Sequence, residues 1–292
     1  MNKITWLVVG LALAGVARAG QPIDETRDLA PDGLVTVINV AGDIDISTWD
    51  RPQVHLTGQL GDKSKLNIQE SSGGLRIEVQ AEDRNWNRHH YEESDLTLKV
   101  PVGASLSVNG VSSDINISGS RGESITVESV SGDIEVDAKV QSLDLSTVSG
   151  DVDFRGSSPR TSAEAVSGDL DLEGLSGELE VSLVSGDADV RGGKFSRGKF
   201  ESVSGELQME LSVAAGGRLT VESMSGDVVL HLPDDQEGEI RAQTFSGDIR
   251  SQFGSPQREK NGPGSKLLFE AGSSGATIHL ESFSGDIQIG HK

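Results

Sequence analysis

A four-residue phrase returns along most of the chain: a large apolar residue, then Ser-Gly-Asp or a near variant, before an alternating apolar stretch. The acid that ends the phrase recurs after 18, 18, 18, 19, 21, 21 and finally 38 residues. It stands at Asp133, Asp151, Asp169, Asp187, Glu206, Asp227, Asp248 and Asp286. A period of about twenty residues is typical of repeat proteins, in which each unit buries its apolar face only against its neighbours.

Within each unit, apolar residues have fixed positions relative to the acid, at −8, −6, −3, +1 and +3. The unit around Asp133 places Ile125, Val127, Val130, Ile134 and Val136 there. Spacing by two predicts strands with one buried face. The step of three between −6 and −3 breaks this alternation and predicts a bend there. Ser-Gly then supplies turn chemistry, because glycine tolerates positive φ.

The same register appears upstream around Asp43 and Asp114, so the repeats begin near residue 34. Between them the sequence predicts an irregular β section with strands over Gln53–Gln59, Lys65–Gln69, Leu75–Gln80 and Asp95–Val100. A polar loop over residues 82–94 interrupts this section. A second loop, over residues 254–264, stands where one expected repeat is missing.

These patterns predict an all-β fold, namely a parallel β-solenoid of 18–21-residue Val-Ser-Gly-Asp repeats with an irregular β section near the N-terminus. Equivalent residues would then stack about 4.8 Å apart. An antiparallel meander, in which each Ser-Gly-Asp is a hairpin turn, is the alternative. We expect a signal peptide over 1–19, an N-terminal β section with the first repeat over 20–110, and solenoid repeats over 111–292.

The first residues have the features of a secretory signal peptide. Lys3 is followed by a short apolar run and then by Ala17-Arg18-Ala19, which predicts cleavage after Ala19. The apolar run is too short to span a bilayer comfortably, and no later segment resembles a membrane span. The chain has no cysteine, which excludes disulfides and thiol catalysis. Together these features predict a periplasmic or secreted bacterial protein without a membrane span after cleavage.

The formal net charge is −21 at pH 7. Such a surface argues against nucleic acid as a partner, since phosphate contacts need clustered Lys and Arg. It argues equally against adsorption to anionic lipid. Cationic partners and divalent ions remain compatible with this charge, which also serves solubility.

Several segments in order match a known family. They are Gly33–Val37, Gly42–Ile44, Thr48–Asp50 and Leu96–Gly103, followed by the serial Val-Ser-Gly-Asp units. Over roughly residues 33 to 292 the chain resembles the bacterial toast-rack family of adhesin-like envelope proteins. The resemblance implies a β-solenoid-like fold and an extracytoplasmic location. It implies no enzyme activity, and there are no family catalytic residues to transfer.

The repeat acids are the first candidate site, because stacking would place them along one edge. Unit charges about 4.8 Å apart repel by roughly 0.9 kcal/mol even in water. Hydrogen bonds from a nearby Ser hydroxyl or turn N–H would offset this, and a row of Ca²⁺ ions is the alternative. No other cofactor is expected. The candidate calcium ligands are Asp133, Asp151, Asp169, Asp187, Asp227 and Asp248.

Two further sets of side chains could contact partners. Acids at position −5 would make a solvated face able to bind a basic partner: Glu128, Glu164, Glu201, Glu222 and Glu281. The polar loop holds the least repetitive exposed residues, so it is the candidate contact loop. Its residues are Trp86, His89, His90 and Tyr91. Adjacent histidines can hold a transition metal, but no third ligand stands at a defined spacing.

We therefore predict a non-enzymatic, exported binding or structural module of the bacterial cell envelope, with an unidentified envelope or surface partner. One alternative is an envelope-stress or regulatory component. Another is a carbohydrate-active β-helix enzyme, which a cluster of acids and aromatics in one groove would support. The final strand, Asp286–Ile289, runs almost to the C-terminus. If it forms an uncapped end, copies of the protein could associate end to end.

Overall fold

The computed structural model describes residues 20–81, 92–258, 264–273 and 275–292. All regular elements in these ranges are β-strands, which confirms the predicted all-β class. The strands of the irregular section lie close to their predicted ranges. They are β4 (Gln53–Leu60), β5 (Ser64–Ser71), β6 (Gly74–Ala81) and β7 (Asp95–Pro101). No helix among the described residues is long and apolar enough to cross a membrane.

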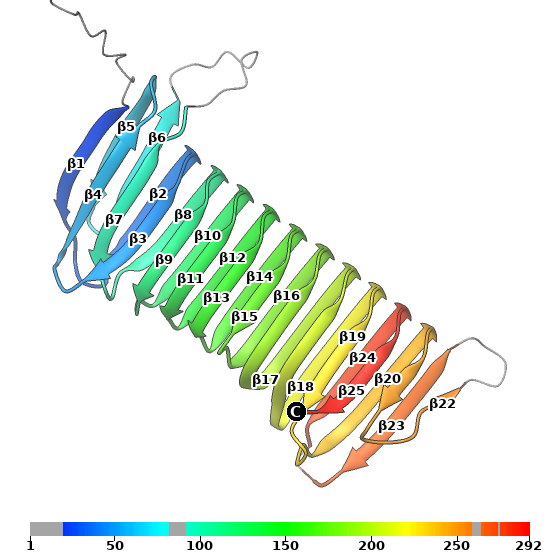
Figure 1. The fold of residues 1–292 in the computed structure, drawn as a ribbon. Coiled ribbons are helices and arrows are strands. Elements are labelled where there is room, and N and C mark those ends of the chain that lie inside the picture. Colours follow the sequence, from blue (N-terminus) through cyan, green and yellow to red (C-terminus); the bar gives the residue numbers. More distant parts are fainter. Residues whose placement is uncertain (1–19, 82–91, 259–263, 274) are drawn as a thin grey trace, which may run out of the picture.

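The basic unit is a coil of two strands that meet at a Ser-Gly-Asp corner, as in β10 (Ser124–Ser131) and β11 (Ile134–Lys139). Successive coils pair in parallel, so that equivalent residues lie side by side, as in Ile125 against Leu143. Figure 1 shows these coils stacked into a long oblique ladder. The neighbouring coils are β8 (Ser105–Ser112) with β9 (Ile115–Ser120), β12 (Ser142–Ser149) with β13 (Val152–Ser157), and β14 (Arg160–Ser167) with β15 (Leu170–Glu173).

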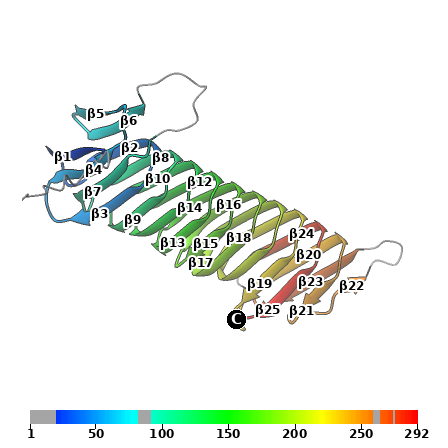
Figure 2. The ribbon, with the colours of Figure 1, turned by 45° about the horizontal axis from the view of Figure 1, so that its top comes forward.

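Further along, two strands, β17 (Ala188–Ser204) and β18 (Leu207–Ser225), are long enough to take part in two coils each. β16 (Gly177–Ser185) leads into β17, and β18 leads into β19 (Val228–Leu232). The first part of β17 pairs with β15, whereas its second part pairs with β16. The stack therefore has two rows of strands (Figure 2). We call the row with β8, β10, β12, β14 and β16 the ridge row, and the row with β9, β11, β13 and β15 the opposite row.

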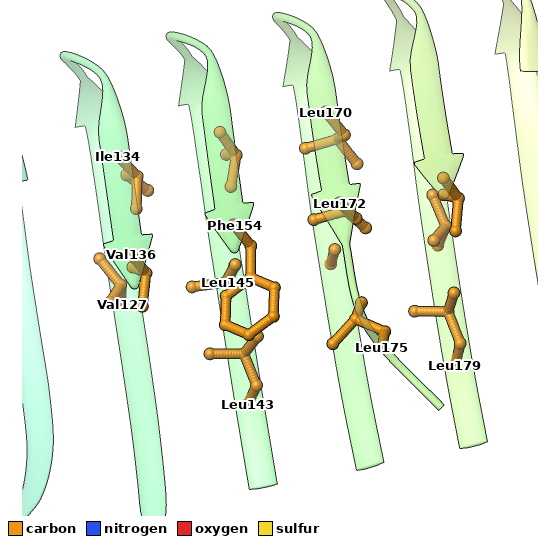
Figure 3. Packing of buried hydrophobic residues seen from close by; sticks show 14 of the residues in the cluster. Val127, Ile134, Val136, Leu143, Leu145, Phe154, Leu170, Leu172, Leu175 and Leu179 are labelled. Carbon is orange, nitrogen blue, oxygen red and sulfur yellow. The ribbon is translucent and has the colours of Figure 1, made fainter. Parts of the chain in front are cut away.

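A thin apolar core fills the space between the two rows (Figure 3). Each coil contributes alternate residues, such as Val127 from the ridge row and Ile134 and Val136 from the opposite row. Phe154 is the largest labelled side chain in this layer and is fully buried. Only 4% of the residues of the chain are aromatic, a composition that suits a thin core.

At the N-terminal end the order of the stack departs from the order of the chain. β2 (Leu34–Ala41) lies between β6 and β8, and β3 (Ile44–Trp49) lies between β7 and β9. Antiparallel strands close this end: β5 pairs with β6, while β4 pairs with β7 and with β1 (Gln21–Asp28). The predicted domain boundary after residue 110 falls inside β8, and the division into domains stays a prediction.

The C-terminal end has the same kind of rearrangement. β24 (Thr277–Ser284) pairs with β18 and β20 (Gly238–Ser246), and β25 (Ile287–His291) pairs with β19 and β21 (Ile249–Ser251). In Figure 1 the red coil accordingly lies between the yellow and orange ones. β23 (Ser265–Ala271) then caps β20 in antiparallel fashion and pairs with β22 (Gln257–Arg258).

This arrangement corrects the expectation that the final strand could form an uncapped end, and it shows where the last coil lies. The final strand is not an end of the stack, because it has a partner on each side. The missing repeat leaves no gap either, because the last coil occupies the place between the coils that precede it in the chain. End-to-end association of copies stays a prediction, but the last strand does not supply its edge.

We expect Gly186→Ala to lower the free energy of unfolding by about 2 kcal/mol, the range of one strained backbone residue. Gly186 has φ of +128°, and an added Cβ would lie 2.2 Å from the carbonyl oxygen of Gly168 in the preceding coil. Chemical denaturation measures this change. Gly73→Ala is the matched control, since nothing lies within 4 Å of its added Cβ. Equal unfolding midpoints for both variants would contradict the close corner contact.

Candidate interaction surface

The apolar residue at position −3 points outward in the structure. In β10, Ser129 at −4 is buried, whereas Val130 at −3 is exposed. The inward alternation therefore continues through −8, −6 and −4, and the strand runs on to Ser131. The predicted bend at the step of three is wrong. The small residue at −4 fills the narrowing core, and the chain turns instead at the Ser-Gly-Asp corner.

Parallel stacking aligns these outward residues into one line, which we call the apolar ridge. Their side chains are between 45% and 59% exposed. Outside the apolar ridge, Leu34 and Leu268 are the only exposed large hydrophobic residues among the described residues. In stack order the apolar ridge consists of Val111, Val130, Val148, Val166, Val184, Val203, Met224, Phe283 and Phe245.

The apolar ridge becomes bulkier towards the C-terminal end, where valines give way to Met224, Phe283 and Phe245. The two phenyl rings stack with centroids 5.0 Å apart and planes 5° from parallel. They are neighbours because β24 lies between β18 and β20. The bulky end of the apolar ridge therefore depends on the rearranged order of the coils.

A half-open pocket of about 770 Å³ lies at this end. Its apolar lining comes from Val203, Met224, Phe245 and Phe283. The polar lining comes from the same strands and from the start of the cap: Ser202, Glu222, Ser223, Gln243, Thr244, Gly264, Lys266, Glu281 and Ser282. The pocket therefore combines an apolar surface with two carboxylates and the ammonium group of Lys266.

The two pocket carboxylates are partners in the register, because Glu222 of β18 lies beside Glu281 of β24. Gln243 Nε2 donates a hydrogen bond to Glu281 Oε1 at 2.7 Å, and His279 Nε2 lies 3.6 Å from Glu281 Oε2. Glu222 forms no ion pair with any described residue. The two carboxylates outnumber Lys266, the one lysine among the lining residues, so the lining carries a net negative charge.

One coil away, the charge at position −5 is balanced. Lys199 Nζ donates to Glu201 at 2.8 Å and to Glu180 at 3.0 Å. These hydrogen bonds raise the pKa of Lys199 above its usual value, and the bond that Lys199 donates to Glu201 is the larger cause. The predicted row of outward acids is therefore present, but its balance of charge differs from coil to coil.

The repeat acids form a hydrogen-bonded ladder at the corners. The backbone N–H of Asp151 donates to Oδ1 of Asp133 in the preceding coil at 2.9 Å. Turn N–H groups thus do bind the carboxylates, but across coils rather than within one turn. Glu206 is one methylene longer and accepts no such bond from a described residue. The other donor–acceptor pairs are Asp43–Asp95, Asp133–Asp114, Asp169–Asp151, Asp187–Asp169, Glu206–Asp187, Asp286–Asp227 and Asp248–Asp286.

Two arginines form ion pairs with aspartates at the C-terminal end of this ladder. Arg250 lies 3.3 Å from Asp286, and Arg258 lies 3.5 Å from Asp248. Over the ranges that the structure describes, no group of three or more His, Asp or Glu side chains could hold a metal ion. Calcium binding at Asp133, Asp151, Asp169, Asp187, Asp227 and Asp248 stays a prediction.

The predicted contact loop has four candidate contact residues. Trp86, His89, His90 and Tyr91 all lie outside the described residues. Their role in binding therefore stays a prediction. The apolar ridge is the surface that sequence reasoning missed, although its residues were all visible in the repeated phrase.

The chain belongs to the Toastrack DUF4097 family, whose model matches residues 36–290. Among solved structures it is similar to a putative lipid binding protein from Parabacteroides distasonis, with 15% identity, 92% of this chain and 97% of that chain covered, and a TM-score of 0.50. It is also similar to a putative adhesin from Bacteroides fragilis, with 10% identity, 93% of this chain and 97% of that chain covered, and a TM-score of 0.44. A putative adhesin from Parabacteroides merdae has 11% identity, 94% of this chain and 97% of that chain covered, and a TM-score of 0.41. No curated protein matches. At 15% identity the first likeness concerns the fold alone.

We expect the Asp169→Asn variant to unfold at the same midpoint temperature as the wild type or at a higher one. We expect Asp169→Ala to lower the free energy of unfolding by about 1 kcal/mol. Asparagine keeps an Oδ1 acceptor for the N–H of Asp187, 2.8 Å away, and removes one charge from the row. Alanine removes the acceptor. Thermal unfolding in EDTA and in millimolar Ca²⁺ measures both effects. A large rise in midpoint with calcium that Asp169→Asn abolishes would show that the ladder is a calcium site instead.

At the N-terminal end, Asp43 is exposed, but partial desolvation of its carboxylate, followed by the charges of Asp95 and Asp114, raises its pKa above 3.8. The folded state therefore binds this proton more tightly than the unfolded chain does. The resulting stability is present below pH 3.8 and is lost as the pH rises through the folded-state pKa.

We therefore expect Asp43→Asn to raise the unfolding midpoint at neutral pH and to give no gain well below the unfolded pKa. Thermal unfolding across this pH range measures the difference. Asp50→Asn, which removes the same charge from an exposed bend, is the control. A gain for Asp43→Asn that is the same at every pH would contradict this account.

Proposed function

We propose that this protein is a non-enzymatic, exported binding module of the bacterial cell envelope, and that the apolar ridge is its contact surface. The Toastrack family membership supports the envelope role. The predicted signal peptide supports export to the periplasm or beyond. The partner belongs to the envelope or to a surface that the envelope meets.

The observation on which this proposal depends is the unbroken apolar ridge. Fully burying a valine or phenylalanine side chain is worth about 1.5–3 kcal/mol, so covering the exposed half of each ridge residue would contribute about 1 kcal/mol. The same strands carry polar residues at −5 and −7, as in Glu128 and Thr126, so a polar residue at −3 would be compatible with a strand. Contiguous exposed apolar surface of this kind marks interaction sites in soluble proteins.

One observation supports the alternative that the protein is a carbohydrate-active enzyme. The pocket combines acids with aromatic rings, namely Glu222 and Glu281 with Phe245 and Phe283. We favour binding over catalysis for two reasons. The phenyl rings stack on each other, so each covers a face of the other. Acids at −5 also recur on coils that have no ring, as at Glu164. Hydrolysis of an envelope polysaccharide that Glu281→Gln abolishes would favour the enzyme.

We expect the triple variant Val148→Thr, Val166→Thr and Val184→Thr to bind isolated bacterial envelopes at least tenfold more weakly than the wild type. Threonine keeps the β-branched shape, so the free energy of unfolding should change by no more than about 0.5 kcal/mol per site. Co-sedimentation of the purified protein with envelopes of the bacterium that produces it measures binding.

The matched control is Ser146→Thr, Ser162→Thr and Ser182→Thr, which places threonine on the same three strands away from the apolar ridge. Cell fractionation checks the location, and the mature protein should begin at Gly20. A ridge variant that binds envelopes as well as the control does would overturn the proposed role of the apolar ridge.

A further inference from the structure

We propose that the C-terminal end of the apolar ridge, at the pocket between Glu222 and Phe245, binds a basic amphipathic segment of another polypeptide. This inference rests on the proposed function, and it names the chemistry of the partner. The segment would present apolar side chains to Met224, Phe283 and Phe245, and lysine or arginine side chains to Glu222 and Glu281.

The apolar half of the pocket is unlike the rest of the apolar ridge. Met224, Phe283 and Phe245 are each more than half exposed, and they replace valines on three adjacent coils. The pocket of about 770 Å³ lies within the size range of sites that enclose small ligands. It has room for several side chains of a partner, whereas the valine section of the apolar ridge offers a narrower line of contact.

The charged half of the pocket favours a cationic partner, because the carboxylates of Glu222 and Glu281 outnumber its lysine, Lys266. Glu222 and Glu281 lie opposite each other on adjacent strands, which are about 4.8 Å apart. Glu222 has no ion pair among the described residues, whereas Glu201 on the preceding coil is held by Lys199. A cation placed between the two pocket carboxylates would relieve their repulsion and leave the balanced coil unchanged.

The charge also decides against other occupants. A second copy of this chain would bring the same carboxylates to the contact, in a protein with net charge −21. Nucleic acid and anionic lipid carry the wrong sign. A basic amphipathic helix presents an apolar line beside a basic line along one axis, which is the arrangement of the ridge residues and the −5 acids.

The test measures binding of a labelled synthetic peptide of leucine and lysine, with leucine at i, i+3, i+4 and i+7, to the full mature chain by fluorescence anisotropy. We expect the double variant Glu222→Gln and Glu281→Gln to weaken binding at least tenfold and to reduce its dependence on salt. The control variant, Glu128→Gln and Glu164→Gln, removes two charges of the same row far from the phenyl rings and should bind as the wild type does.

A second peptide, with glutamate in place of each lysine, should not bind. Equal binding of both peptides, or unchanged affinity in the Glu222 and Glu281 variant, would overturn the inference. Binding to neutral phosphatidylcholine vesicles in place of the lysine peptide would overturn it as well and would indicate a lipid partner. Thermal unfolding of each variant confirms that it is folded.

The outcomes separate this inference from the proposed function. If the valine triple variant loses envelope binding while the Glu222 and Glu281 variant keeps it, the apolar ridge is the contact surface and the basic partner is wrong. If the valine triple variant keeps envelope binding, the proposed function fails whatever the peptide does.

Discussion

The stack depends on how closely the backbone of one corner approaches the next. At Gly150 an added Cβ would lie 2.3 Å from the carbonyl oxygen of Gly132, so only glycine fits this place at this spacing. The following acid then bonds across the same gap, as Asp151 N–H does to Asp133 Oδ1. Glycine permits the approach and aspartate joins the two coils, so the pair sets the spacing and register of the rows. The contact recurs at most corners, although Ser113 replaces the glycine before Asp114 and Glu206 accepts no such bond from a described residue.

Because the register is parallel, one outward residue per coil becomes a continuous surface. Val130 alone would be an ordinary exposed valine. Aligned with Val148, Val166 and their equivalents, it becomes part of the apolar ridge, and the acids at −5 line up beside it. Repetition thus makes the surface, and departures from repetition, such as Phe283 in place of valine, make one end of it chemically distinct.

Local periodicity was sufficient to predict the all-β class and the ranges of β4 to β7. It failed at position −3, because hydrophobicity alone does not tell an inward residue from an outward one. The buried positions near the corner hold small residues such as Ser129 and Thr147, which the pattern reads as polar. The place of the last coil could not be predicted either. The separation of 38 residues from Asp248 to Asp286 resembles a missing repeat. The local sequence does not indicate which strands the last coil joins.

The rearranged coils at the two ends change how the stack can come apart. In an array that follows chain order, the outermost coil peels away as a free tail. Here β20 and β21 are the outermost C-terminal coil, but the chain before and after them stays anchored in β19 and β24. Peeling them off releases only a closed loop, which gains less conformational entropy than a free tail does. β6 and β7 are held in the same way between β3 and β8. The outermost parallel coils therefore resist unzipping, whereas the edge strand β1, which pairs with β4, is not held by a closed loop.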